Sequence, residues 1–181
     1  MATSSPDFMS VVLATTYTTS DVRERLALLR RFLEDTFFAG AATPTVERLE
    51  EFLDTANAGA ETRSVLARWL GAWAGALARE TLYERLRSIE RDVSALPVLG
   101  IIMPVRLRED EMARLGAWAR EHVDPRVLVD SLADPAAVGG CRLIWNGRER
   151  DFSLSYFVEK HREELVDAVL EVFTHTTGGK T

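Results

Sequence analysis

The stretch from Asp134 to Leu154, DPAAVGGCRLIWNGRERDFSL, constrains the fold of this chain more than any other. Its Asn146-Gly147 pair tolerates the positive φ angles of a type I′ turn, and the residues on either side alternate as strands do. Asp134 precedes a proline, so its carboxylate can bond to the backbone of a turn whose next φ angle is fixed. The stretch therefore predicts a β-hairpin over residues 142–152 that follows a tight turn.

The glycines and polar residues that flank this hairpin have structural roles. Gly139-Gly140 supplies backbone conformations, or a close backbone approach, that a Cβ atom would forbid. Asp151 and Ser153 bracket the change from strand to helix, and either side-chain oxygen can cap the exposed amides of the closing helix. These residues specify a fold and carry no reaction chemistry.

The first 94 residues carry apolar residues at helical spacing. They predict a short first helix over residues 8–13, a helix over 22–37, one from Thr43-Pro44 to about residue 56, and a long helical segment over 60–94. Near residues 79–81 the apolar stripe changes register, which predicts either a kink or two helices. Such stripes need to pack against other helices, so this part predicts a helical bundle.

Pro97 marks a change of pattern. The residues after it predict a strand over 98–107, a helix over 109–122, a strand over 126–132, the hairpin, and a closing helix over about 153–174. A strand–helix–strand connection of this length implies a crossover. The expected fold class is α+β: an all-helical bundle (1–95), a small β-α-β-β-β-α domain with a mixed sheet (96–175), and a disordered tail (176–181).

Charge and composition exclude several classes of protein. The net charge is −6, and each half carries 11 basic and 14 acidic side chains without a basic cluster, so we expect no nucleic-acid partner. A single cysteine, Cys141, excludes an internal disulfide. No apolar run has the length of a membrane span. The first 20 residues lack Lys and Arg, which argues against a presequence or a secretory signal and favours a cytoplasmic protein.

No motif for catalysis or metal binding is present. His122, His161 and His175 lack the spacing that places two ligands on one metal ion. His161 lies on the apolar stripe of the closing helix, which favours a core or interface histidine with a satisfied ring. The final Gly178–Thr181 segment lacks both the first glycine and the following helix of a phosphate-binding loop. We therefore expect no cofactor, no metal and no enzyme activity.

The pattern of the second half resembles subunit delta of the F-type ATP synthase, the counterpart of the mitochondrial oligomycin-sensitivity-conferring protein. That family has an apolar strand, a leucine-plus-acidic helix start, a helix, an alternating strand, Asp-x-x-x-x-Gly-Gly, a strand, a short turn, Asp-x-Ser and a final helix. The matching positions here are Val98–Val105, Leu107 with Glu109 and Asp110, Met112–His122, Val127–Leu132, Asp134, Gly139-Gly140, Arg142–Trp145, Asn146-Gly147, Asp151, Ser153 and Leu154–Phe173.

The resemblance implies a non-catalytic peripheral-stalk, or stator, subunit on the cytoplasmic face of the bacterial plasma membrane. Its helical bundle would hold the N-terminal helices of the alpha subunits, and its second domain would grip the C-terminal helices of the b subunits. Candidate core or groove residues for the alpha contact are Leu26, Leu29, Leu33, Trp69 and Trp73. Candidates for the b contact are Leu165, Val169, Val172 and Phe173.

Three other classes stay open at the level of sequence. The family's usual N-terminal Tyr-Ala-x-Ala-Leu motif has no match around Val11–Tyr17, so a divergent delta-like adaptor of another complex is one alternative. A small ligand-binding or regulatory domain would have an enclosed pocket lined by Trp69 and Trp73. An enzyme would have a cleft with converging polar groups.

Overall fold

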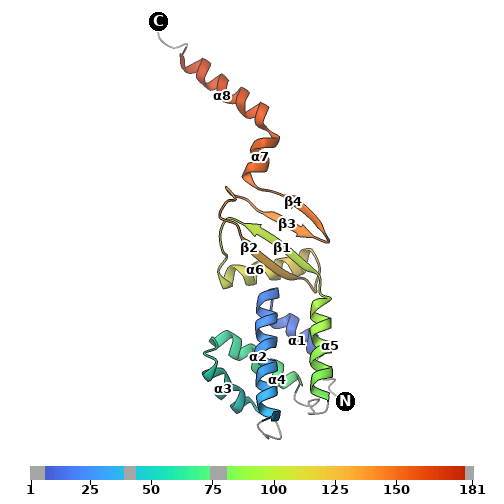
Figure 1. Ribbon diagram of the computed structural model, residues 1–181. Helices are drawn as coiled ribbons and strands as arrows, with labels where there is room; N and C mark the ends of the chain where they lie inside the picture. Colours follow the sequence, from blue (N-terminus) through green and yellow to red (C-terminus); the bar gives the residue numbers. More distant parts are fainter. Residues whose placement is uncertain (1–6, 39–43, 74–80, 178–181) are drawn as a thin grey trace. The chain divides into compact units, whose positions relative to one another are not determined.

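The computed structural model describes residues 7–38, 44–73 and 81–177, and side chains as far as residue 171. Within these residues the chain forms eight helices and one four-stranded sheet (Figure 1). The elements of the first part are α1 (Phe8–Thr15), α2 (Thr19–Phe38), α3 (Val46–Thr55), α4 (Ala60–Trp73) and α5 (Leu82–Ser94). Those of the second part are β1 (Val98–Met103), α6 (Glu109–His122), β2 (Leu128–Ala133), β3 (Arg142–Trp145), β4 (Arg148–Asp151), α7 (Leu154–Lys160) and α8 (Arg162–Thr177).

The predicted α+β class is confirmed, with helices at the N-terminus and a mixed sheet in the C-terminal half. The closing helix differs from the prediction, because two helices, α7 and α8, replace the single run over residues 153–174. α8 also continues to Thr177, so residues 176 and 177, which were expected to belong to a disordered tail, are helical. Residues 178–181 of that tail, and the register change expected near residues 79–81, lie wholly or largely outside the described residues.

His161 separates α7 from α8. Its backbone leaves the helical conformation, with φ −110° and ψ 23°. Its ring stacks on Phe157 with the centroids 5.1 Å apart, and its Nδ1 atom lies 3.0 Å from Oε2 of Glu164. The ring therefore has partners, as the sequence predicts, but they belong to its own two helices and the side chain is partly exposed rather than in a core.

By its internal contacts the chain divides into two compact units. The first unit comprises residues 1–98 and 110–129, and the second comprises residues 99–109 and 130–181. α6 therefore groups with the N-terminal helices, whereas the sequence pattern placed a boundary at residue 96 and α6 beyond it. The contacts of Arg120 and Gly116, both on α6, give the physical reason for this grouping.

Arg120 attaches α6 to the last turn of α1 and to the segment that links α1 and α2. Its guanidinium donates hydrogen bonds to the carbonyl oxygens of Leu13 and Thr16, and it lies over the ring of Tyr17 at 4.6 Å from the centroid. Burial lowers the pKa of Arg120. Gly116 permits the close approach, because a Cβ atom there would lie 2.5 Å from the Cβ atom of Tyr17.

Helices α2 and α4 bind the end of α1 and the first residue of the same linker. The buried Arg25 donates to the carbonyl oxygen of Thr15 at 3.1 Å and to Oγ1 of Thr16 at 2.9 Å, and it pairs with Glu61 at 2.7 Å. The indole Nε1 of Trp69 donates to Oγ1 of Thr15 at 2.8 Å. Since a buried charge needs such partners to be tolerated, this linker is a fixed part of the first unit.

The apolar stripes of the first unit build one core. Leu29 and Leu33 of α2 and Trp69 of α4 are fully buried in it. Phe8 of α1 stacks on Trp73 at 5.2 Å between centroids and meets Trp69 edge-on at 5.7 Å. These stripes therefore serve the bundle itself, which is the packing that amphipathic helices require.

The third predicted helix begins later than the sequence pattern indicated. α3 starts at Val46, and Oγ1 of Thr45 accepts a hydrogen bond from the amide of Arg48 at 3.4 Å. Thr45 is thus the N-cap, rather than Thr43. A threonine hydroxyl has the same role at α2, where Oγ1 of Thr18 accepts from the amide of Asp21 at 3.0 Å.

The sheet has the strand order β2-β1-β3-β4. The β1–β3 and β3–β4 pairs are antiparallel. Strands β1 and β2 are neighbours joined through α6, and the amides of Leu128 and Asp134 bond to the carbonyls of Pro97 and Met103 with a constant sequence offset. A constant offset is the pattern of a parallel pair, so the sheet is mixed, as predicted.

Candidate functional site

The hairpin that the sequence predicts is present, and its turn has the expected geometry. Asn146 has φ +50° and Gly147 has φ +71°, the two positive angles of a type I′ turn. Trp145 pairs with Arg148 across the turn. The register of β3 and β4 is thereby fixed at their closed end.

At the open end, the segment leading into β3 is bonded to the segment leaving β4. The carbonyl oxygen of Gly139 accepts from the amide of Leu154 at 3.0 Å, and that of Cys141 accepts from the amide of Phe152 at 2.8 Å. Gly140, between them, has φ +75°. We call this junction of residues 139–141 with residues 152–154 the clasp. Gly140 approaches the backbone of Phe152 closely, which confirms the prediction that this position needs a glycine.

Asp151 and Ser153 start α7 from the clasp. Oδ1 of Asp151 accepts from the amide of Ser153 at 2.7 Å, and Oγ of Ser153 accepts from the amide of Tyr156 at 3.2 Å. The hydrogen bonds from Ser153 hold the pKa of the Asp151 carboxyl below its usual value, and the charge of Arg142 adds to this effect. Ser153 is thus the N-cap of α7.

Asp134 forms the predicted turn and joins it to the hairpin. Its Oδ1 atom accepts from the amide of Ala136 at 3.0 Å. Its Oδ2 atom lies 3.4 Å from a guanidinium nitrogen of Arg142, whose other terminal nitrogen lies 3.3 Å from Glu149 on β4. The structure therefore gathers Asp134, the two glycines, Asp151 and Ser153 at one end of the hairpin.

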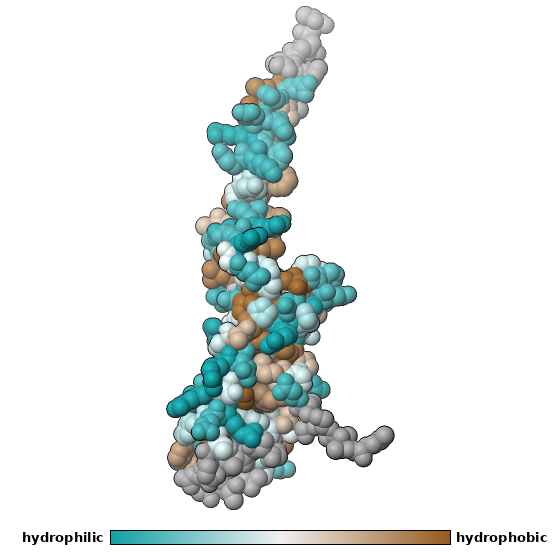
Figure 2. Space-filling model, turned by 90° about the vertical axis from the view of Figure 1, so that its right-hand side faces the viewer, coloured by the Kyte–Doolittle hydropathy of each residue, from teal (hydrophilic) through white to brown (hydrophobic). Residues whose placement is uncertain are grey.

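The clasp leads into two helices with exposed apolar side chains. As far as residue 171, no side chain of α7 or α8 is buried. Figure 2 shows hydrophobic surface among hydrophilic surface along these helices. The large apolar side chains, between 45 and 59% exposed, are Leu154, Tyr156, Phe157, Val158, Leu165, Val166, Val169 and Leu170. Exposed apolar surface of this kind is typical of interaction sites.

The candidates that the sequence analysis named for the b contact lie on α8. Leu165 and Val169 are exposed there. The side chains of Val172 and Phe173 lie outside the described residues. Val166 and Leu170, on the same helix, were missed, although their spacing of four residues would have indicated a second apolar row beside the first.

The five candidates named for the alpha contact are core residues. They are Leu26, Leu29, Leu33, Trp69 and Trp73, and each is at most 9% exposed. All five belong to the core cluster of the first unit. In this structure they stabilise the bundle and offer no surface to a partner.

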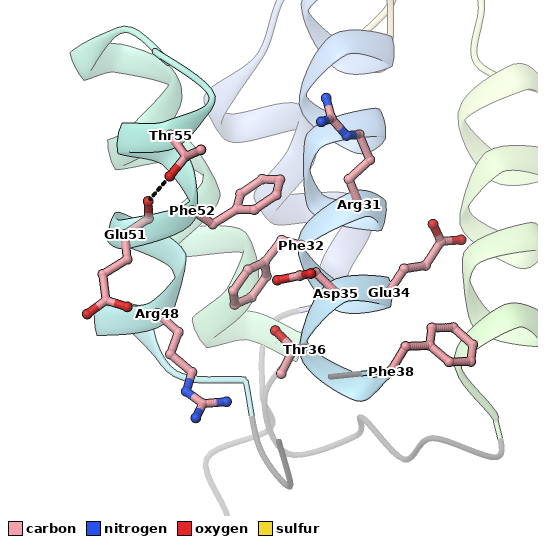
Figure 3. A pocket seen from close by; sticks show the side chains of 10 residues that line it. All are labelled: Arg31, Phe32, Glu34, Asp35, Thr36, Phe38, Arg48, Glu51, Phe52 and Thr55. Carbon is pink, nitrogen blue, oxygen red and sulfur yellow. Dashed lines mark hydrogen bonds between the residues drawn. The ribbon is translucent and has the colours of Figure 1, made fainter. Parts of the chain in front are cut away.

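The first unit also has an open pocket between α2 and α3, with a volume of about 960 Å³. Figure 3 shows Phe32 and Phe52 between these two helices, and their ring centroids lie 5.8 Å apart. Arg31 lies over the Phe52 ring at 5.9 Å. Both basic and acidic side chains line this pocket, among them Arg48 and Glu51.

Neither a metal site nor a membrane-spanning helix is found in the part of the chain that the structure describes. No group of three or more His, Cys, Asp or Glu side chains there is placed to hold a metal ion. No helix in the same residues has both the length and the apolar character needed to cross a bilayer.

The chain matches no protein-family model. No curated protein gives a significant match to it either. The candidate site is therefore defined by geometry: a clasp that starts two helices whose apolar side chains are exposed.

Proposed function

We propose that this protein is a non-catalytic peripheral-stalk subunit of a proton-translocating F-type ATP synthase, of the delta type, which links the catalytic head to the b subunits. The observation that carries the proposal is the exposed apolar surface of α7 and α8. The order of structural features around it supports the delta type: a mixed sheet, an Asp134 turn, a Gly139-Gly140 clasp and a Ser153 cap.

The two units of such a stalk subunit bind different partners. α7 and α8 bind the C-terminal helices of the b subunits by helix-in-groove recognition, in which apolar side chains at helical spacing are the anchors. A durable contact needs roughly 800 Å² on this chain, more than a few isolated side chains supply. Eight large exposed apolar side chains on adjacent helices supply a surface of that kind.

The first unit has the other role, contact with the N-terminal helices of the alpha subunits. Because Leu29, Leu33 and Trp69 are buried, this contact uses the outer surfaces of the helices rather than those side chains. Arg25 and Arg120 bind the junction between α1 and α2. These hydrogen bonds give the first unit the rigidity that an attachment under torque needs. The protein acts on the cytoplasmic face of the bacterial plasma membrane, within the complex and without inserting in the bilayer.

A divergent delta-like adaptor of another complex is the second candidate. The lack of any matching family model favours it, because the clasp and the exposed helices would suit any helical partner. The two candidates differ in the partner and agree on the binding surface.

Capture of the tagged full-length chain from its native membranes in mild detergent tests both. The stator proposal predicts that the alpha and b subunits are recovered, and that the double variant Leu165→Asn, Val169→Asn loses the b subunits. Asp167→Asn is the matched control on the same helix and should retain them. Recovery of a different complex with the same sensitivity to the double variant would favour the adaptor instead.

A further inference from the structure

The apolar surface of α8 is wider than one partner helix can cover. At about 100° per residue, the apolar residues from Ala168 through Leu165, Val169 and Val166 to Leu170 span an arc of about 200°. One charged residue, Arg162 at the first position of α8, lies within this arc, and it pairs with Glu159 of α7 at 3.9 Å. A helix that faces a single neighbour needs an apolar stripe of about 100°. The apolar arc of α8 is therefore wide enough to pack against two neighbouring helices.

Both halves of this arc are open to the same extent. Leu165 and Val169, on one half, are 45% and 53% exposed. Val166 and Leu170, on the other half, are 50% and 57% exposed. The described part of the chain covers neither half, so a partner would have to cover both.

The charges of α8 indicate the chemistry of that partner. Glu163, Glu164, Asp167 and Glu171 lie on the side opposite the apolar arc. On the helical wheel Glu163 adjoins Leu170 at one edge of the arc, and Glu164 adjoins Ala168 at the other edge. Carboxylates at the edges of a helical seam pair with Lys or Arg on the partner, as at the flanking positions of coiled coils.

The same charges argue against the two other occupants of an apolar helix. A second copy of α8 would place carboxylates beside carboxylates, which is destabilising. Helices that lie on membrane surfaces carry Lys and Arg on the polar face, whereas this face carries four acidic residues. Anionic lipid would therefore repel it.

We infer that α8 lies in the groove between two partner helices whose groove edges carry Lys or Arg, so that the three helices form one bundle. The inference deepens the proposed function and rests on it only for the identity of the pair, which would be the C-terminal helices of two b subunits. The width of the arc and the acidic edges are properties of this chain.

Titration of the full chain with designed probes tests the inference. The probes are a two-helix hairpin with a Leu-lined groove edged by Lys, the same hairpin edged by Glu, one helix of the Lys hairpin alone, and a disulfide-linked pair of peptides that carry the C-terminal helix of the b protein. The Lys hairpin should bind at least about tenfold tighter than the Glu hairpin or the single helix.

Variants of α8 test the two halves and the edge separately. Leu165→Asn with Val169→Asn, and Val166→Asn with Leu170→Asn, should each weaken binding of the Lys hairpin by about tenfold or more. Glu163→Lys, at the edge, should weaken it by several-fold, whereas its matched control Asp167→Lys, in the middle of the acidic side, should change it by less than about twofold. Circular dichroism should show unchanged folding, because all these side chains are exposed.

Three results would overturn the inference: equal binding of the single helix and the hairpin, sensitivity to only one half of the arc, or failure of both the Lys hairpin and the b pair to bind. Self-association or binding to anionic vesicles in preference to the Lys hairpin would also overturn it. If the Lys hairpin binds through both halves and the b pair does not, the inference stands and the stator proposal fails. If the b pair binds through one half only, the stator proposal stands and the inference fails.

Discussion

A Cβ atom on Gly140 would lie 2.2 Å from the carbonyl oxygen of Phe152. Gly140 also has φ +75°, a conformation that side-chain-bearing residues rarely adopt. Gly140 precedes β3 and Phe152 follows β4, so this contact closes the open end of the hairpin. The same contact fixes the point at which α7 begins, and with it the start of the proposed binding surface.

Substituting Gly140 by Val should therefore disrupt the hairpin. The new side chain would meet backbone atoms that cannot move without breaking the clasp, and the backbone strain adds to the clash. We expect a loss of about 3 kcal/mol or more in the stability of the second unit, with the helices of the first unit retained. Residue-resolved hydrogen exchange would separate the two responses.

Gly71→Ala is the matched glycine control for this variant. Gly71 lies inside α4 and a Cβ atom there would meet nothing within 4 Å. We expect a gain of roughly 0.5–1 kcal/mol, because alanine is the better helix former. Equal melting of Gly140→Val and the wild-type chain would contradict the role assigned to the clasp.

Arg120→Ala should destabilise the first unit. The variant leaves the carbonyl oxygens of Leu13 and Thr16 without their guanidinium donor and removes the packing on Tyr17. We expect a loss of about 2–4 kcal/mol in the free energy of unfolding. Arg114→Ala, on the exposed side of the same helix, should change it by less than about 0.5 kcal/mol. Denaturant unfolding measures both, and similar values for the two variants would refute the anchoring role of Arg120.

Ser153→Ala should shorten or loosen α7. The hydroxyl of Ser153 is the N-cap acceptor for the amide of Tyr156, and loss of such a cap costs about 1 kcal/mol. Ser94→Ala is the control, since that hydroxyl donates to the carbonyl of Glu90 at the exposed end of α5. Amide exchange in α7 should rise in the first variant only. A rise of the same size in both variants would count against a specific cap.

Acid should weaken the start of α7 through Asp151. Its pKa is lowered in the folded chain, chiefly by the hydrogen bonds from Ser153. The contribution of this carboxylate to stability is therefore complete above the unfolded-state value of about 3.9, and it is lost as the pH falls through the lower, folded-state pKa. Hydrogen exchange of the Ser153 amide against pH measures the effect. Asp151→Asn should remove this part of the pH dependence, and an unchanged profile in that variant would exclude Asp151 as its source.

Much of the second half could be predicted from sequence because the signals are local. Asn146-Gly147 requires only its own positive φ angles, and Ser153 caps the helix three residues from its acceptor amide. The bounds of α6, Glu109–His122, also follow from periodicity and match the structure. Such features depend on neighbours in the chain, which a sequence displays directly.

The grouping of α6 and the burial of each apolar stripe depend on contacts between residues far apart in the sequence, which leave no local signal. Arg120 bonds to backbone carbonyls of Leu13 and Thr16, far away in the chain, so nothing in the side-chain pattern indicated that α6 groups with the first unit. Leu29 and Leu165 lie on similar apolar stripes, yet the first is buried and the second is exposed. Periodicity identifies the apolar face of a helix but not what covers that face, so the sequence could not separate core residues from interface residues in the bundle.

Site-specific photo-crosslinking within native membranes tests the central claim, that α8 binds the b subunits of an ATP synthase, most directly. A photoreactive residue replaces Leu165 on the apolar side of α8, and the same residue at Asp167, on the acidic side, is the matched control. We expect an adduct with the b protein from position 165 and little or none from position 167. No such adduct from position 165, or equal adducts from both positions, would contradict the claim.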